Sequence, residues 1–176
     1  MRGPLKRNLK KARQNLRVEF SHRMQGAHQE LMHEFVARNG LPERVKRLFF
    51  KMPDFVACSD KAHVLNAWDK KDKLAAFYVV DFEARRFSNY IIGCYSQKNY
   101  VLGASDLLLF ELINLSREHD KLYIHLGLGV NPGIRRFKEK WGGVPKRRYE
   151  MGELVLKKPS LFEMISSLLN HRQEGL

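Results

Sequence analysis

The chain has 176 residues, enough for one domain with a sizeable core, and 44% of them are hydrophobic and 29% charged. This composition is ordinary for a folded globular protein and excludes a disordered or fibrous chain. No apolar run approaches the roughly 18 to 20 residues of a membrane helix, and the N-terminus lacks a secretory signal, so we expect a cytoplasmic protein without an integral membrane segment.

The formal net charge of +13 is concentrated in two stretches of the sequence. Residues 1–17 contain seven Lys or Arg and no acid, and residues 135–148 contain seven with Glu139 as the single acid. Over the remaining residues, bases and acids balance. Two local basic patches on a neutral body are expected to concentrate an anionic partner, and phosphate-bearing ligands are the first candidates.

The cysteines and histidines give no sign of a metal centre. Cys58 and Cys94 lie in apolar, strand-like surroundings without CxxC spacing, so we expect buried thiols and not a disulfide. The seven histidines show no HExxH or comparable spacing. No metal site is therefore predicted.

The N-terminal part of the chain has helical periodicity. Apolar residues recur at helical spacing over 5–16, with bases on the other positions, which predicts a basic amphipathic helix that starts near Pro4. Residues 17–21 are predicted to be extended. Two further helices are predicted over 27–35 and 41–49, on either side of the Asn39-Gly40 break.

The middle of the chain has the alternation of β-strands. We predict strands over 54–59, 62–69, 73–82 and 87–96, with a polar hairpin turn at Lys70 to Asp72. Consecutive strands joined by short turns indicate an antiparallel meander.

Helices and strands alternate in the last third of the chain. The apolar run 104–116 is too long for a strand and predicts a buried helix, and 121–129 predicts another strand. Asn131-Pro132 and Gly142-Gly143 are typical start and stop signals for a short helix between them. A strand over 147–156 and a helix over 160–169 follow.

This order of elements predicts a fold of the α+β class: a single domain with an antiparallel meander and a mixed sheet flanked by helices. Residues 1–20 are expected to be a basic helix and strand that extend, and pack on, a domain of residues 21–176.

The segment IHLGLGVNPGIRRFKEKWGG (124–143) carries a resemblance to a known family. A strand ending in glycines, a short connection, a helix with Phe137-Lys138 and a terminal glycine resemble the GNAT superfamily of acyltransferases, and the likeness extends over about 61–149. Many acetyltransferases of that superfamily have a tyrosine acid on the short helix. Phe-Lys at this place resembles the second, catalytic half of FemABX-like aminoacyltransferases.

The resemblance implies transfer of an acyl group to an amine, from acyl-CoA or from aminoacyl-tRNA, without a tightly bound cofactor. The loop 97–106 departs from the Q/R-x-x-G-x-G/A pattern whose amides hold the CoA pyrophosphate, which argues against CoA binding in the usual mode. FemABX-like enzymes have two such halves, so either a homodimer replaces the missing one or the groove that binds the acceptor is absent. The alternative is a non-catalytic GNAT-like module that binds tRNA or another polyanion.

Three residues are candidates for catalysis. The cation of Lys138 would stabilise an oxyanion, a carboxylate or a phosphate, unless it is a solvated lysine beside Glu139. Strand alternation places His125 on the more polar face, where it would act as a general base or make a structural hydrogen bond. Asp81 ends a strand, either as a base or as part of an ordinary charged turn.

Five residues are candidates for binding substrate or an anion. Gly127 and Gly129 would let a ligand approach the strand, or would simply permit a bend. Asn131 is expected to cap the following helix, whose capped amides would also bind an anion. Arg135 and Arg136 would hold a phosphate, or belong to an exposed face.

Overall fold

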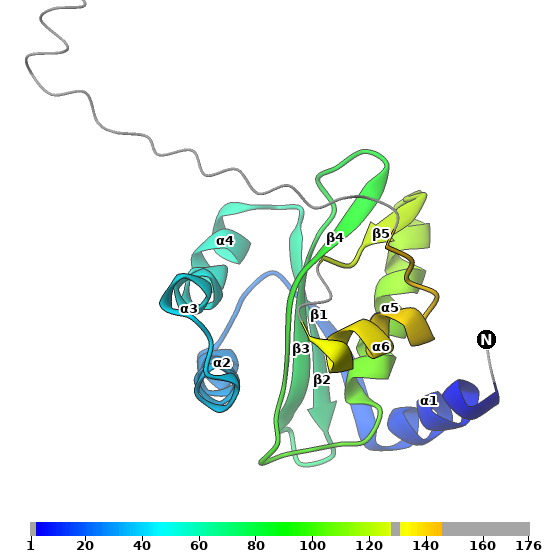
Figure 1. Ribbon diagram of the computed structural model, residues 1–176, viewed down its shortest axis with the longest axis horizontal. Helices are drawn as coiled ribbons and strands as arrows, with labels where there is room; N and C mark the ends of the chain where they lie inside the picture. Colours follow the sequence, from blue (N-terminus) through cyan, green and yellow to red (C-terminus); the bar gives the residue numbers. More distant parts are fainter. Residues whose placement is uncertain (1–2, 128–130, 146–176) are drawn as a thin grey trace, which may run out of the picture. The chain divides into compact units, whose positions relative to one another are not determined.

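The computed structural model of the protein describes residues 3–127 and 131–145. Residues Met1–Gly143 form one compact unit, which contains every described helix and strand, and Val144–Leu176 form a second unit. In the first unit a five-stranded mixed sheet lies between two layers of helices (Figure 1). The predicted α+β class is confirmed.

The strands follow one another across the sheet in the order β1-β2-β3-β4-β5. The first four are antiparallel neighbours, and β5 runs parallel to β4. The strands predicted over 62–69, 73–82 and 87–96 are confirmed, whereas the strand predicted over 121–129 is present but shorter. Their bounds are β1 Leu16–Ser21, β2 Ala62–Asp69, β3 Leu74–Asp81, β4 Phe87–Tyr95 and β5 Tyr123–His125.

One face of the sheet is covered by α5 (Ala104–Glu118), and α1 (Gly3–Asn15) packs on α5. The predicted buried helix is confirmed, because Leu108 and Leu112 of α5 are fully enclosed. α1 contributes its apolar stripe to the same cluster. α6 (Pro132–Lys140) lies on this side as well, where Phe137 packs against the cluster (Figure 1).

The opposite face is covered by α2 (Gly26–Asn39), α3 (Glu43–Phe50) and α4 (Met52–Cys58) (Figure 1). The helices predicted at 27–35 and 41–49 are confirmed. The central strand β3 is therefore buried on both sides, which explains its nearly continuous apolar run. The buried apolar residues from the helices on this face are Leu31, Met32, Val36, Phe49, Met52 and Val56.

Two predictions about residues 54–59 are wrong. This segment belongs to α4 and is not a strand, because Pro53 suits the first turn of a helix and Met52 and Val56 have helical spacing. A run this short has no periodicity that separates a strand from a helix. Cys58 at the end of α4 is exposed and not buried, while Cys94 in β4 is buried as expected; both are free cysteines.

The strand predicted over 147–156 and the helix predicted over 160–169 lie outside the described residues. Among the helices that are described, none combines the length and the hydropathy needed to cross a membrane.

Truncation of Leu112 tests the packing of α5. We expect Leu112→Ala to lower the free energy of unfolding by about 2–5 kcal/mol, because the site is fully enclosed and the cavity cannot collapse. Leu122→Ala is the matched control: Leu122 is 68% exposed, so its truncation should cost no more than about 0.5 kcal/mol. Urea denaturation measures both, and similar losses would contradict this assignment of the core.

Candidate functional site

The sheet opens between β4 and the chain that follows β5. The two strands pair over three residues, and the last pair joins Asn89 to His125. Beyond it, β4 continues beside β3 to Tyr95, and no ladder pair joins β4 to Leu126 or Gly127. Backbone groups beyond the last ladder pair need partners other than the neighbouring strand, and we call this point, beside Tyr90 and Gly127, the opening of the sheet.

A β-bulge in β4 lies at the opening. Val79 pairs with Ile92 and Val80 with Tyr90, so Ile91 is an extra residue in β4. Bulges of this kind re-aim neighbouring side chains and are frequent next to functional sites. The bulge places Tyr90 on the same face as α5, where it packs against Tyr78.

Lys138 of α6 points to this opening. Its Nζ lies 5.8 Å from the centre of the Tyr90 ring, and 4.0 Å from the position that a Cβ on Gly127 would occupy. The side chain is half-buried. Burial penalises the charged form and lowers the pKa of the Lys138 amine from its ordinary value.

Gly93, which was not among the predicted site residues, leaves room for the Tyr90 ring. The Tyr90 ring meets Tyr78 edge-on, with 4.8 Å between centroids, and lies beside Gly93. A Cβ on Gly93 would collide with the Tyr90 hydroxyl and with the Tyr78 ring. Burial raises the pKa of both phenols, so both stay protonated. The available signal was an isolated glycine inside a strand, which marks a close approach of other atoms.

Asp81, Asn89 and His125 form a row on the opposite face of the sheet. Asp81 is the register partner of Asn89, and Asn89 is the partner of His125. The Asn89 amide donates a 3.3 Å hydrogen bond to Asp81 Oδ2. Because two strand spacings separate them, Asp81 and His125 are about 10 Å apart across the sheet. The structure brings these two candidates onto one face and Lys138 onto the other.

The remaining predicted residues belong to α6 or precede it in the sequence. Asn131 caps the helix as expected, since its side chain accepts a 2.8 Å hydrogen bond from the Ile134 N–H. The Arg135 guanidinium donates to Glu139 at 2.8 Å, and Arg136 is exposed. Gly127 has φ +64°, which supports a bend that other residues rarely adopt. Gly129 lies outside the described residues.

A buried carboxylate ties α6 to the start of α5. Asp106 Oδ1 lies 2.6 Å from Lys140 Nζ and accepts a 2.8 Å hydrogen bond from the Trp141 indole N–H. The Asp106 side chain is 10% exposed and that of Lys140 is 43% exposed, so the carboxylate is shielded from water while the lysine is partly solvated. Asn131 at one end and Asp106 at the other fix the helix that presents Lys138. Sequence reasoning missed this contact because 35 residues separate Asp106 from Trp141.

A cavity of about 340 Å³ adjoins the first turn of α5. It is bounded by Asn8 of α1, by the segment from Tyr95 to Asp106, and by Phe137 and Lys140 of α6. Tyr100 on its rim is 61% exposed. The cavity therefore lies between both basic helices and the start of α5.

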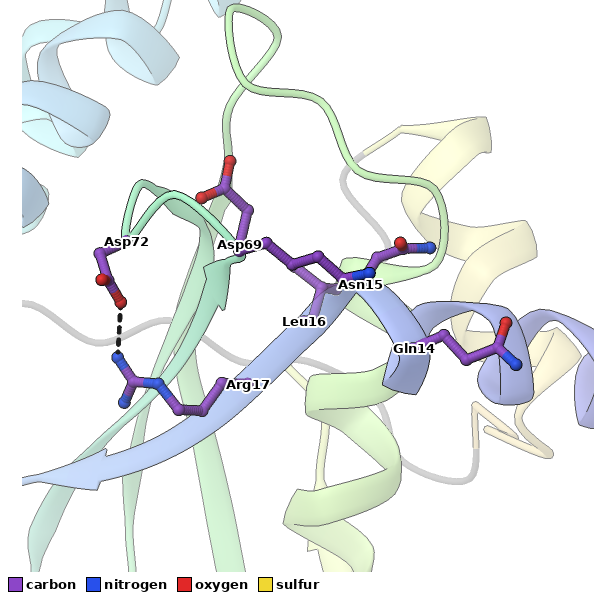
Figure 2. A pocket seen from close by; sticks show the side chains of 7 residues that line it. Gln14, Asn15, Leu16, Arg17, Asp69 and Asp72 are labelled. Atoms are coloured by element: carbon purple, nitrogen blue, oxygen red, sulfur yellow. Dashed lines mark hydrogen bonds and ion pairs between the residues drawn. The ribbon is translucent and has the colours of Figure 1, made fainter.

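A second hollow of about 340 Å³ lies where α1 runs into β1, beside the turn between β2 and β3 (Figure 2). Its polar groups are paired with one another: Arg17 lies 3.1 Å from Asp72, and Asp69 accepts hydrogen bonds from the backbone N–H groups of Lys71 and Lys73. These contacts shape the turn, and we assign no chemistry to this hollow. Within the described part of the chain, no three His, Cys, Asp or Glu side chains are arranged to hold a metal ion.

Comparison with known proteins shows the fold. No family model matches the sequence, and no curated protein matches it. Among solved structures, a possible acetyltransferase from Clostridium difficile 630 is 10% identical with a TM-score of 0.60, over 82% of this chain and 99% of the other. The ribosomal-protein-alanine N-acetyltransferase of Brucella melitensis is 14% identical with a TM-score of 0.52, over 81% and 99% of the two chains.

A third similar structure contains a ligand. AAC(6')-Iy, in complex with the bisubstrate analog CoA-S-monomethyl-acetylneamine, is 8% identical with a TM-score of 0.57, over 80% of this chain and 99% of the other. At these identities the likeness establishes architecture, not activity. The chain has the fold of GNAT acetyltransferases.

The amine of Lys138 should lose its proton at lower pH than a solvated lysine, because burial disfavours its charged form. The pH dependence of labelling by acetic anhydride, followed by peptide mass spectrometry, measures this, with the exposed Lys10 in the same molecule as control. In Tyr90→Ala the pKa of Lys138 should rise towards the ordinary value, since water gains access. Identical titration of Lys138 and Lys10 in the wild type would show that Lys138 is solvated.

Proposed function

We propose that this chain transfers an acyl group from an ester or thioester to an amine, at the opening between β4 and β5. The observation that carries the proposal is the placement of a half-buried lysine at this opening. Lys138 lies beside Tyr90 and Gly127, on a helix fixed at both ends. The GNAT fold supports this chemistry, because the similar structures include acetyltransferases.

The reaction sets the requirements for the site. The amine nitrogen attacks the carbonyl carbon, a C–N bond forms, and negative charge develops on the carbonyl oxygen. When the tetrahedral intermediate collapses, the C–S or C–O bond breaks and the leaving group takes up a proton. In this proposal Lys138 stabilises the developing negative charge, which is worth most where water is excluded.

A base must remove the proton that the amine loses. His125 and Asp81 are the two candidates, both on the face opposite Lys138 and both in the row that ends at the opening. The ordinary pKa of histidine, about 6.5, suits proton transfer near neutral pH. Asp81 accepts hydrogen bonds from Asn89 and from the Glu83 N–H, which orient its carboxylate.

The donor in this proposal is acyl-CoA or aminoacyl-tRNA, and both molecules carry phosphate groups. The capped first turn of α6, with Gly127, Asn131 and Arg136, would hold its phosphates. Arg135 is less available because Glu139 already pairs with it. The acceptor is an amine, and a second copy of the chain would supply any missing part of its groove.

Removing the charge of Lys138 tests the proposal. Lys138→Met keeps the stem and loses the amine, and we expect kcat to fall by about 10²–10³, as for loss of one oxyanion donor. The assay supplies acetyl-CoA or a pool of aminoacyl-tRNA with a panel of amines and detects the acylated amine by mass spectrometry. Lys71→Met, on the exposed β2–β3 turn, is the control. Unchanged turnover in Lys138→Met would make the assigned role wrong.

The pH profile distinguishes the two candidate bases. If His125 is the base, the rise of kcat/KM with pH should be abolished in His125→Gln and preserved in Asp81→Asn. If Asp81 is the base, that rise should be preserved in His125→Gln and abolished in Asp81→Asn. A profile that neither substitution alters would exclude both residues.

A further inference from the structure

α1 is anchored to the core through its apolar stripe. Leu5, Leu9 and Ala12 are 7%, 4% and 0% exposed, and they pack in the cluster around α5. At the end of the helix, Arg13 lies 3.0 Å from Glu111 of α5 and 4.7 Å above the Phe110 ring. The orientation of α1 is therefore fixed, and one face of the helix is turned to solvent.

The charged side chains on that outer face are all basic. Lys6, Arg7, Lys10 and Lys11 are all exposed, and α1 contains no acidic residue. Among the ion pairs of the described residues, the one that involves α1 joins Arg13 to Glu111, on the side of the helix that contacts α5. Pairs three or four residues apart on a helix are about 5–6 Å from one another. The four cations therefore form one compact surface that suits a ligand with several negative charges.

The burial of the apolar stripe argues against a lipid surface. A basic amphipathic helix binds a membrane by inserting its apolar face among the acyl chains. In this protein Leu5 and Leu9 are already covered by the core, so only the charged face remains. The surface favours a soluble polyanion.

The residues that line the cavity beside α1 indicate which class of polyanion this surface binds. Asn8 of α1 lines it, and Lys11 is one turn further along the same helix. Tyr95 and Tyr100 line the same cavity; their ring centres are 6.4 Å apart, and they are 38% and 61% exposed. The Arg38 guanidinium lies over the Tyr95 ring, so Tyr100 is the more accessible of the two. Exposed aromatic rings beside a row of cations are the combination that binds single-stranded nucleic acid, through stacked bases and neutralised phosphates.

We infer that α1 and the cavity beside it form a binding surface for single-stranded nucleic acid. The exposed face of α1 neutralises the phosphates, and an unpaired base stacks on Tyr100. This surface is defined by charge, burial and ring exposure alone, so the inference goes beyond the proposed acyl transfer and does not require it.

Fluorescence anisotropy with a labelled oligonucleotide of about 20 nucleotides, as RNA and as DNA, tests the inference across a salt series. The α1 variant replaces Lys6, Arg7, Lys10 and Lys11 by Gln. We expect at least tenfold weaker binding at low salt. The slope of log K against log salt should decrease in magnitude by roughly 0.7 for each lost phosphate contact.

A control variant separates local from overall charge. It replaces four exposed bases elsewhere, Lys70, Lys71, Arg85 and Arg86, by Gln, and so loses the same net charge. Its affinity and salt slope should stay close to those of the wild type. Equal losses in both variants would overturn the inference, because binding would then follow net charge and not α1. Circular dichroism and thermal unfolding confirm that both variants are folded.

Tyr100→Ala tests the stacking contact. Loss of one stacked base should weaken binding roughly 5- to 150-fold with the salt slope unchanged. Vesicles with and without phosphatidylserine are compared in parallel. Vesicle binding that is tighter than oligonucleotide binding and depends on the α1 bases would overturn the inference in favour of a membrane surface.

Discussion

The parallel pairing of β4 with β5 ends after three residues, and the surrounding structure depends on this break. Once the strands separate, their edge amides and carbonyls need other partners. The bulge at Ile91 turns Tyr90 towards α5, and Gly127, two residues after β5, has a positive φ. Both features depart from the regular backbone geometry of a β-strand. A longer ladder between β4 and β5 would need regular strands at this point.

α1 belongs to the core and to the surface at the same time. α5 is too apolar to stand exposed on its outer side, and the apolar stripe of α1 covers part of it. The same helix then has every charged position directed outward or towards Glu111. A charged extension that served only solubility would have no need of a buried stripe. The packing explains why the cations lie at a fixed place beside the cavity.

The sequence predicts the strands and the long helix well, because their patterns are unambiguous. Alternation over 62–69 and 87–96 and the long apolar run from Ala104 have one physical solution each. The sequence of Met52–Cys58 is compatible with a strand or with a helix, and the packing of Val56 on the sheet favours the helix. Periodicity assigns faces within a strand and leaves the register between strands open.

The candidate site was predictable only in part, because local sequence identifies its residues but not their positions relative to one another. Lys138, His125 and Asp81 are found from local sequence, and the cap at Asn131 follows from its position before Pro132. Their relation to one another depends on contacts between distant segments. The row through Asn89 follows from strand register, and the carboxylate of Asp106 meets Trp141 only after folding. No spacing in the sequence encodes either contact.

The two lysines of α6 show how one short helix provides both anchorage and charge. Lys140 is neutralised by the shielded carboxylate of Asp106, so its charge stabilises the helix position. Lys138, two residues earlier, lies over the Tyr90 ring, and the ring face offsets part of the cost of burying a cation. A partly desolvated charge interacts more strongly with new negative charge than a solvated one does, because the local dielectric is lower. The burial that lowers the pKa of Lys138 therefore also makes its cation a stronger electrostatic partner for an oxyanion at the opening of the sheet.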